Sequence, residues 1–487
     1  MELSGHKQKR NLPLKTVILG ITSAFAAAFA MTLIAAARFH GLEPALGRPI
    51  ELSNWAADYS LLFVLLLLVA CAFYLYIAIY QREIAHSPRH IGAMLAIFAI
   101  SYGACLIFGA FSVLAMPLAL SVALYALEND PKHHALPAAF FMAAALAAAL
   151  LVKSRIDGEW AVREAVYAVL GTLIGGSVAV ILLRREVTRV KLILYTVLAG
   201  LTYVPLYFLV LGINANYAAI GRDFTFYAVG LLGTPILTQM LQPLIDWAFN
   251  LVSVVRLLEI CNMNHPLLKR MAEEAPGTYH HCMTVAKFAE ECAAAIGENR
   301  YLARAAGYFH DAGKLEAADF FSENQGGGEN PHDEIGPEVS CDIIRAHTKR
   351  GLAVCKKYRI PAEITAGMLE HHGTLAIYYF YAKAMELNDG KTPDLTQYQY
   401  TGPLPQTKIN ALIMICDGAE AALRAQGKSD HQAVRQKVEE IIRMRVNFGQ
   451  FDECPITFRD LDIIKDVIVE IFCGLRHDRI KYEDKKY

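Results

Sequence analysis

The sequence predicts an all-α protein in two parts, a polytopic bundle of transmembrane helices followed by an all-helical domain. Of its 487 residues, 55% are hydrophobic and only 19% are charged, with a mean hydropathy of +0.31. Long uncharged runs fill residues 16–250, whereas charged residues interleave with apolar ones at helical spacing from about residue 256. The first part therefore suits lipid and the second suits water.

Apolar runs define the membrane domain, which we place at residues 1–250. Runs long enough to cross a hydrocarbon core of roughly 30 Å cover 16–37, 60–80, 135–152, 165–183, 192–213 and 224–245. Residues 91–127 form one more uncharged run. As a single helix this run would be about 55 Å long, so we expect two spans cut near Gly109–Ser112. The prediction is about eight transmembrane helices.

The placement of Lys and Arg predicts the orientation. With the N-terminus inside, the inside segments carry eleven of these residues and the outside loops carry six, which favours both termini in the cytoplasm. We expect the first apolar run, residues 16–37, to be a retained membrane helix and not a signal peptide.

The remaining chain is predicted to be helical. Residues 251–264 continue from the last span as a stalk helix, 265–475 form the water-exposed domain, and 476–487 form a charged tail. We expect loops at 324–337 and 388–406. The net charge of −1 gives no reason to expect a nucleic-acid polymer as partner. Ten cysteines without a C-x-x-C pair argue against disulfides and a thiolate zinc site.

A set of histidines and aspartates carries the chemistry. Each lies in a largely apolar, helix-compatible stretch, and the set is His281, His310, Asp311, His347, His371, His372 and Asp417. Buried imidazoles and carboxylates need partners, and a pair of metal ions would supply them. Imidazole and carboxylate ligands without thiolate suit iron or manganese.

The pattern H…HD…H…HH…D resembles the HD superfamily of metal-dependent phosphohydrolases. The closest resemblance is to its seven-transmembrane HD family of cyclic-di-AMP phosphodiesterases. The stretches that carry it are NHPLLKRMAEEAPGTYHH, YFHDAGK, ENQ with NPHD, HHGT…YYFYAKA, GPLPQTK and GQFDECPITFRDL, between residues 264 and 461. The resemblance implies a helical HD domain on the cytoplasmic face of a bacterial inner membrane, hydrolysing cyclic di-AMP to linear pApA. It leaves open whether the chain forms a homodimer.

The resemblance also implies roles for individual residues. His281, His310, Asp311 and Asp417 would hold one metal, while Asp311, His347, His371 and His372 would hold the other, with Asp311 bridging. Iron is the expected metal and manganese the alternative. His281 is preferred to His280 because it fits the register of the family's first ligand helix. Candidate substrate contacts are Lys314, which with Asp311 is also a candidate catalytic residue, and Asn324, Gln325, Tyr379 and Tyr381.

The sequence departs from the family pattern at three points. The usual HDIGK reads HDAGK at residues 310–314, and Gly418 stands where the family usually has Ser. The large extracellular domain between the first two membrane helices is missing, and residues 38–59 occupy its place.

Two other functions stay open. The domain could hydrolyse another nucleotide such as cyclic di-GMP, although the G-Y-P motif of that branch is missing after His372. Alternatively, the protein could be a receptor that binds a nucleotide with little or no catalysis. A bound metal pair would discriminate against the receptor.

Overall fold

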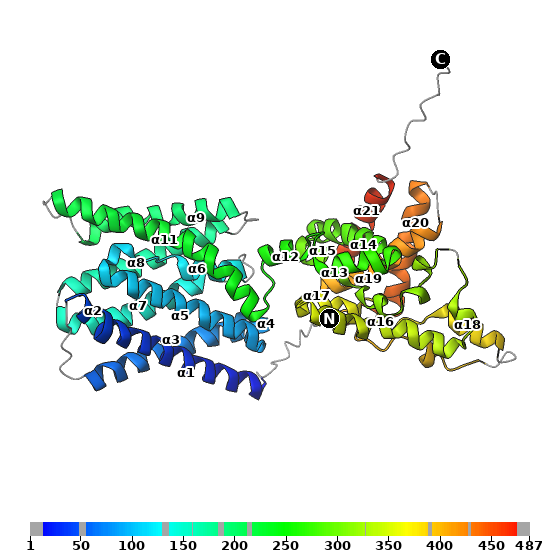
Figure 1. Cartoon of the computed structure of the whole chain (residues 1–487), viewed down its shortest axis with the longest axis horizontal. Coiled ribbons are helices and arrows are strands. Elements are labelled where there is room, and N and C mark those ends of the chain that lie inside the picture. Colours follow the sequence, from blue (N-terminus) through cyan, green and yellow to red (C-terminus); the bar gives the residue numbers. More distant parts are fainter. Residues whose placement is uncertain are drawn as a thin grey trace, which may run out of the picture. The chain divides into compact units, whose positions relative to one another are not determined.

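The computed structural model describes residues 13–47, 55–128, 136–157, 159–183, 189–211, 217–326, 328–387, 392–426 and 430–474. The chain divides into two compact units, Met1–Ser253 (unit 1) and Val254–Tyr487 (unit 2). Within the described ranges every regular element is a helix (Figure 1), apart from an isolated antiparallel bridge between Ala376 and Gln399. The predicted all-α fold is confirmed. The predicted charged tail lies outside the described residues.

Unit 1 is a bundle of long apolar helices. Its elements are α1 (Leu14–Ala37), the π-helical η1 (Arg38–Leu42), α2 (Glu43–Ala45), α3 (Trp55–Tyr80), α4 (Arg82–His86), α5 (Pro88–Phe111), the 3₁₀ turn η2 (Val113–Ala115), α6 (Leu120–Glu128), α7 (Leu136–Asp157), α8 (Glu159–Leu183), α9 (Arg189–Leu201), α10 (Tyr203–Leu206), the π-helical η3 (Tyr207–Leu211) and α11 (Tyr217–Phe249).

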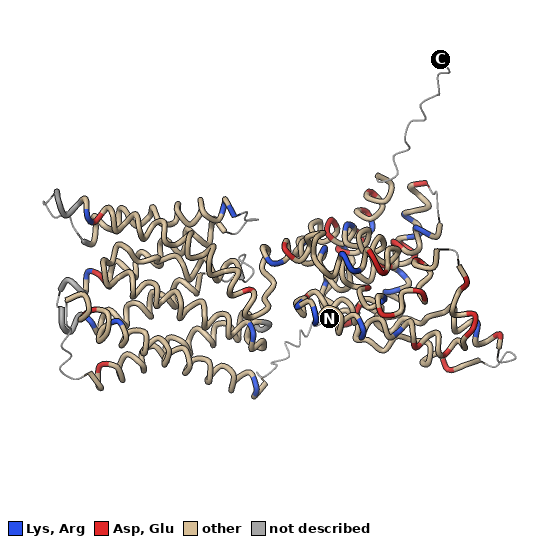
Figure 2. Tube along the Cα trace, in the orientation of Figure 1, with Lys and Arg blue, Asp and Glu red and all other residues tan. Residues whose placement is uncertain are grey.

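The described part of unit 1 contains seven helical segments long and apolar enough to cross a membrane. They are Leu14–Ala45, Trp55–Tyr80, Pro88–Phe111, Leu136–Lys153, Val162–Leu183, Arg189–Val210 and Gly221–Phe249. Large side chains such as Phe25, Leu68 and Met240 are exposed on their outer faces, and charged residues gather near the helix ends (Figure 2). Such a surface matches lipid, so unit 1 is a membrane domain.

The expected eighth span differs from a regular helix. α5 ends at Phe111, close to the predicted cut, and Ser112 is extended with φ −162° and ψ 142°. α6 then has only 9 residues. Val113–Ala126 is buried throughout, and non-helical backbone at membrane depth is stable where protein surrounds it. The second half of the run is thus a broken, protein-enclosed segment, and the count of eight crossings stays a prediction.

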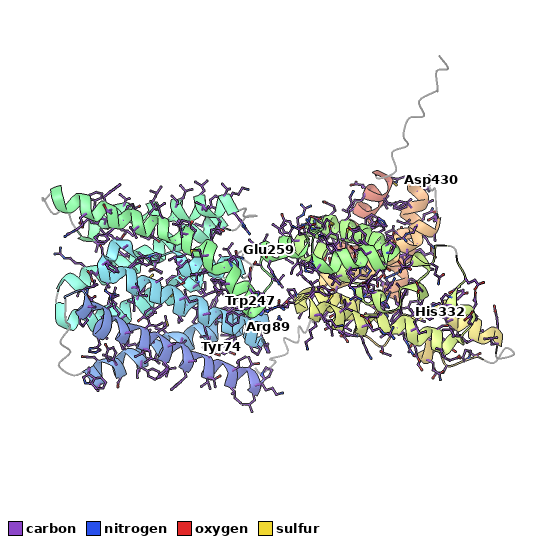
Figure 3. All side chains as sticks on the ribbon, viewed as in Figure 1. Tyr74, Arg89, Trp247, Glu259, His332 and Asp430 are labelled. Carbon is purple, nitrogen blue, oxygen red and sulfur yellow. The ribbon has the colours of Figure 1, made fainter. Side chains whose placement is uncertain are left out.

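Several hydrogen bonds tie together one end of unit 1. The Tyr74 hydroxyl donates to the carbonyls of Thr16 (2.7 Å) and Ala85 (3.4 Å). Arg89 Nη1 donates to the carbonyl of Asn250 (3.3 Å); Tyr74 and Arg89 are labelled in Figure 3. The first residues of α1, the end of α3, the start of α5 and the end of α11 therefore share this end.

The junction after α11 differs from the predicted stalk helix. α11 ends at Phe249, Asn250 has a left-handed φ of 52°, and helix resumes only as α12 (Val254–Ile260). Asn tolerates this conformation better than most residues. The side chains of Gln242, Asp246 and Ser253 hydrogen-bond to one another across the break. These polar contacts stabilise a kinked connection that apolar periodicity alone does not reveal.

Unit 2 consists of shorter helices. After α12 come α13 (Pro266–Glu274), α14 (Pro276–Ala295), α15 (Arg300–Phe309), the 3₁₀ segments η4 (Ala312–Phe320), η5 (Ser322–Asn324) and η6 (Pro331–Asp333), α16 (Pro337–Lys357), α17 (Ala362–Glu370), α18 (Tyr378–Leu387), the 3₁₀ η7 (Leu395–Tyr398), α19 (Lys408–Gln426), α20 (His431–Asn447) and α21 (Phe458–Gly474). Pro at the first position of α13, α14 and α16 suits a helix start, where its missing N–H costs nothing.

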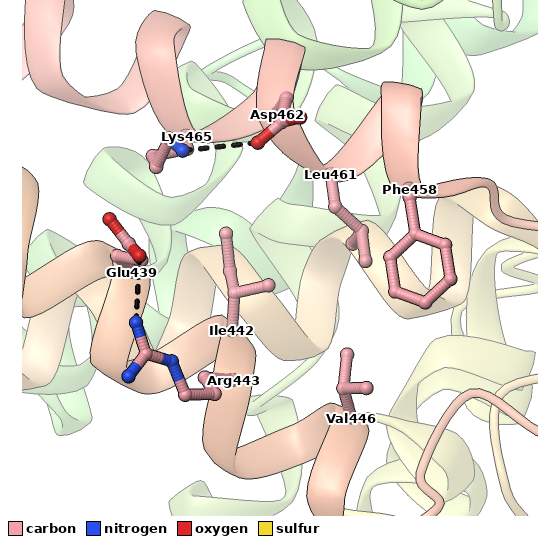
Figure 4. A pocket seen from close by; sticks show the side chains of 8 residues that line it. All are labelled: Glu439, Ile442, Arg443, Val446, Phe458, Leu461, Asp462 and Lys465. Atoms are coloured by element: carbon pink, nitrogen blue, oxygen red, sulfur yellow. Dashed lines mark hydrogen bonds and ion pairs between the residues drawn. The ribbon is translucent and has the colours of Figure 1, made fainter.

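The core of unit 2 lies between α14, α19, α20 and α21. Phe288, Leu412, Val438 and Ile464, one from each helix, are fully buried. A groove of about 200 Å³ lies between α20 and α21 at the edge of this core (Figure 4), lined by Glu439, Ile442, Arg443, Val446, Phe458, Leu461, Asp462 and Lys465. None of the seven predicted metal ligands lines it.

Candidate metal centre

The fold brings all seven predicted ligands together in unit 2. His281 lies within α14, His347 within α16 and Asp417 within α19. The HD pair and the HH pair directly follow the last turns of α15 and α17 respectively. A helix end lets adjacent side chains point to the same place, whereas mid-helix neighbours diverge by about 100°. The helices thus place the two doublets and the three single residues around one point.

Two groups of four residues have ligand atoms within 4.8 Å of one another. One group is His281, His310, Asp311 and Asp417, and the other is Asp311, His347, His371 and His372. This partition coincides with the one that the family resemblance implies. Their role as metal ligands stays a prediction.

Asp311 links the two groups through its two carboxylate oxygens. Oδ2 lies 3.4 Å from His310 Nε2 and 3.5 Å from His281 Nε2. Oδ1 lies 3.3 Å from His347 Nε2 and 3.6 Å from His371 Nε2. One buried carboxylate therefore faces imidazoles on both sides, as a bridging ligand must.

The outer edges of the imidazoles are fixed by hydrogen bonds. The Nδ1–H groups of His310, His347 and His371 donate to the carbonyls of Gly307 (2.8 Å), Ile344 (2.6 Å) and Gly367 (2.9 Å). A carbonyl only accepts, so these bonds leave an Nε2 lone pair pointing inward.

The inner atoms fit a bound cation. His281 Nε2, His310 Nε2 and Asp311 Oδ1 are buried and have no hydrogen-bond partner among the described residues. Buried polar atoms in proteins rarely lack a partner. A metal ion at each group would provide one, and the nitrogen and oxygen donors suit a divalent transition metal.

The electrostatics of the cluster also favour bound cations. Burial lowers the pKa of His347 to about 4, which keeps this imidazole neutral, the form that binds metals. Burial alone would lower the pKa of His281, but the adjacent carboxylates of Asp417 and Glu420 raise it to about 9. The position of His281 therefore favours a positive charge, whether a proton or a metal.

Sequence reasoning missed Glu420. Its Oε2 accepts the hydrogen bond from His281 Nδ1, and Arg424 pairs with its Oε1. Glu420 follows Asp417 by nearly one turn of α19, so the i+3 spacing was the available signal. A carboxylate behind a ligating histidine orients the ring and increases its basicity.

Lys314 lies between two carboxylates. Its Nζ is 2.8 Å from Asp311 Oδ2 and 2.7 Å from Glu323 Oε1, and it lies 5.0 Å from the centroid of the Phe321 ring. Burial opposes its charge, but Asp311 and Glu323 raise the pKa of Lys314 well above its usual range. Lys314 thus brings a fixed positive charge to the bridging carboxylate. Sequence reasoning did not identify its partner Glu323.

Two of the other candidate substrate contacts, Asn324 and Gln325, form hydrogen bonds that hold their own loop in place. The Asn324 side chain accepts from the Thr278 amide (3.0 Å) and donates to the Thr278 hydroxyl (2.9 Å). Gln325 Nε2 donates to the Asp319 carbonyl and to Asn330, each at 3.1 Å. These amides therefore hold the segment after the HD pair in place.

The aromatic candidates lie on α18. Tyr379 is 64% exposed, and Tyr381 packs against Tyr398 with ring centroids 5.7 Å apart. Within the described residues neither forms a hydrogen bond or ring contact with the seven ligands. Tyr400, which sequence reasoning did not single out, stacks on His372 with centroids 4.2 Å apart. The nearest aromatic face therefore comes from outside the predicted set.

Comparison with known proteins identifies this region. Residues 278–422 match the HD domain family. All seven candidate ligands lie within the matched HD domain.

Curated relatives extend the similarity beyond the HD domain. The chain is 40% identical over 323 residues to the cyclic-di-AMP phosphodiesterase PgpH of Listeria monocytogenes, covering 64% of this chain and 44% of the relative. It is 35% identical over 315 residues to PgpH of Bacillus subtilis, with the same coverage. An uncharacterised Synechocystis protein is 34% identical over 293 residues, covering 58% of this chain and 36% of the relative. The matched part thus spans less than half the length of these relatives.

Solved structures also match. The crystal structure of the L. monocytogenes PgpH HD domain is 43% identical, with a TM-score of 0.42, covering 44% of this chain and all of that one. The same HD domain in complex with cyclic di-AMP is 44% identical, with a TM-score of 0.42 and coverage of 44% and 99%.

Proposed function

We propose that this chain is a membrane-bound, metal-dependent phosphodiesterase that hydrolyses cyclic di-AMP to linear pApA at the cytoplasmic face of a bacterial inner membrane. The observation that carries the proposal is Asp311, whose two oxygens face two sets of imidazoles. The named activity of the Listeria and Bacillus relatives supports the choice of substrate.

The two groups of four residues would each hold one divalent metal, iron in the first place and manganese as the alternative. When bound, such a pair acidifies a water molecule and polarises the phosphoryl oxygens of a phosphodiester. The protein itself supplies the fixed orientation of the imidazoles through their Nδ1 hydrogen bonds. It also supplies the charge of Lys314, which would attract a phosphate oxygen.

The side of the cluster at His372 and Asp417 is the more open one. Their side chains are 22% and 14% exposed, whereas those of His310, Asp311, His347 and His371 are at most 2% exposed. A substrate would therefore reach the metals from this side, where Tyr400 also lies.

The test is turnover by the purified full-length protein loaded with Fe²⁺ or Mn²⁺ and offered cyclic di-AMP or cyclic di-GMP. We expect faster cleavage of cyclic di-AMP, with pApA as product. Faster cleavage of cyclic di-GMP would assign another substrate. Nucleotide binding without a bound metal pair and without turnover would favour a receptor.

A further inference from the structure

A buried arginine lies behind the metal-ligand cluster. Arg445, in the last turn of α20, is only 6% exposed. Its Nη1 donates to the Ile441 carbonyl at 3.3 Å, and its Nε has no hydrogen-bond partner. Within the described part of the chain Arg445 forms no ion pair. Burying a guanidinium without an adjacent carboxylate is costly, so its retention there calls for an explanation.

Gly418 provides the space that the guanidinium occupies. A Cβ atom added at Gly418 would lie 1.9 Å from Arg445 Nη2 and 2.8 Å from its Cζ. No side chain fits at this position unless the guanidinium moves. Gly418 directly follows Asp417, so the positive charge lies against the backbone next to a predicted metal ligand.

Asp417 interacts electrostatically with this charge without forming an ion pair. Burial lowers the pKa of Arg445, and the charge of Asp417 counteracts that decrease. The same attraction has a consequence for metals, because a fixed cation near Asp417 repels another cation bound by that carboxylate. In a buried site such repulsion is much less screened than in water.

The two groups of ligands differ in charge. The group with His281 contains two carboxylates, Asp311 and Asp417, whereas the group with His347 contains only Asp311. On charge alone, the first group would hold a divalent cation more tightly. A buried arginine beside Asp417 offsets its extra negative charge.

We propose that Arg445 is a positioning residue that acts through Asp417 to weaken metal binding by the group of His281, His310, Asp311 and Asp417. It thereby brings the affinities of the two metal sites closer together. Gly418 admits the guanidinium. This inference rests on the metal sites of the proposed function.

Charge removal tests the inference in the full-length protein, with Mn²⁺ affinity measured by chelator competition in the absence of substrate. In Arg445→Met we expect the dissociation constant of one of two Mn²⁺ ions to fall by about tenfold, with the other unchanged. Arg445→Lys keeps the charge and should resemble the parent. Arg443→Met is the matched control, because Arg443 lies on the same helix but is exposed and pairs with Glu439 (Figure 4).

Gly418→Ala changes the other partner of the contact between Gly418 and the Arg445 guanidinium. It replaces Arg445→Met if that variant does not fold. The added methyl group should displace the guanidinium and tighten the same Mn²⁺ site. In the metal-free protein, Gly418→Ala should also lower the melting temperature more in the parent background than in the Arg445→Met background. A double-mutant cycle measures this coupling.

Unchanged or weaker Mn²⁺ binding in both Arg445→Met and Gly418→Ala would overturn this inference and leave the proposed function intact. A purely structural arginine would give this result together with a lower melting temperature. If the parent protein binds no Mn²⁺ or Fe²⁺, the proposed function fails and the inference fails with it.

Discussion

Each imidazole with an Nδ1 hydrogen bond to a carbonyl is held by its outer edge, so its inner nitrogen is placed before any metal arrives. The carbonyls belong to residues three or four positions earlier in the same helix, at Gly307, Ile344 and Gly367. The orientation is therefore a local property of the helical turn that precedes each histidine. Asp311 differs, because its side chain faces histidines from α14, α16 and the HH pair as well as its neighbour His310.

The first prediction concerns Asp311. Asp311→Ala should remove the carboxylate shared by both groups, so metal content should fall from two per chain towards zero and turnover should disappear. Lys314→Ala should keep both metals and lower turnover by roughly a hundredfold, because it removes one charge near the phosphate and no ligand. Metal analysis and turnover of both variants beside the parent provide the measurement. Retention of two metals and near-parental turnover by Asp311→Ala would contradict the two-metal assignment.

The second prediction concerns Glu420, which accepts from His281 Nδ1. Glu420→Gln retains an acceptor but loses the charge behind the imidazole, so metal affinity should fall by about 10- to 100-fold. Glu470→Gln, at an exposed position on α21, is the control. Equal Mn²⁺ affinities in the two variants would remove Glu420 from the site.

The ligands could be predicted from sequence because their order and spacing form a recognisable pattern. The choice of His281 over His280 came from the register, and His281 is the buried residue of the two. Glu420, Glu323 and Tyr400 could not be predicted in the same way. Their positions depend on how the elements that carry them pack against other parts of the fold, which local composition does not encode.

At the scale of elements, the segment after the HD pair packs against the start of α14. A Cβ atom at Gly277 would lie 1.8 Å from the carbonyl oxygen of Glu323. This close approach places Glu323 within reach of Lys314 and Thr278. The loop that sequence analysis treated as a candidate substrate contact is thus fixed by the start of α14.

The third prediction follows from this approach. Gly277→Ala should displace the loop and separate Glu323 from Lys314, so turnover should fall by about tenfold or more while two metals remain bound. Gly474→Ala in α21 is the matched control, because nothing lies within 4 Å of an added Cβ there. Parental turnover in Gly277→Ala would show that the loop position does not matter to the reaction.

Helix positions were largely predictable, but the break at Asn250 and the shortness of α6 were not. Apolar periodicity continues across Asn250, yet the chain turns there because the polar side chains of Gln242, Asp246 and Ser253 bond to one another. In the run 91–127 the cut near Ser112 was predictable from length alone. The shortness of α6 was not, since a buried irregular segment has the same composition as a membrane helix.

At the scale of the whole molecule, the two units solve different burial problems. Unit 1 exposes large apolar side chains on most of its long helices, whereas unit 2 buries its apolar residues in a core between α14, α19, α20 and α21. Whether the chain forms a homodimer, which the sequence left open, is not tested by a single chain.

The last prediction concerns how many times the chain crosses the membrane. Thr16 and Ala85 share Tyr74 as a partner, and Arg89 bonds to Asn250, so α1 begins and α11 ends at the same end of unit 1. Seven crossings would put these points on opposite sides. We therefore predict that the segment between α5 and α7 supplies one more crossing, through extended backbone, η2 and the short α6.

Reporters fused after residue 15 and after residue 487 of the full chain should accordingly both report the cytoplasm, as the distribution of Lys and Arg also favours. A reporter inserted after Asp157, between α7 and α8, should report the opposite side. If the two terminal fusions report different sides, then residues 112–128 do not cross the membrane. That result would conflict with the hydrogen bonds at the shared end of unit 1. Helix ends held by hydrogen bonds to common neighbours cannot lie on opposite faces of a bilayer about 30 Å thick.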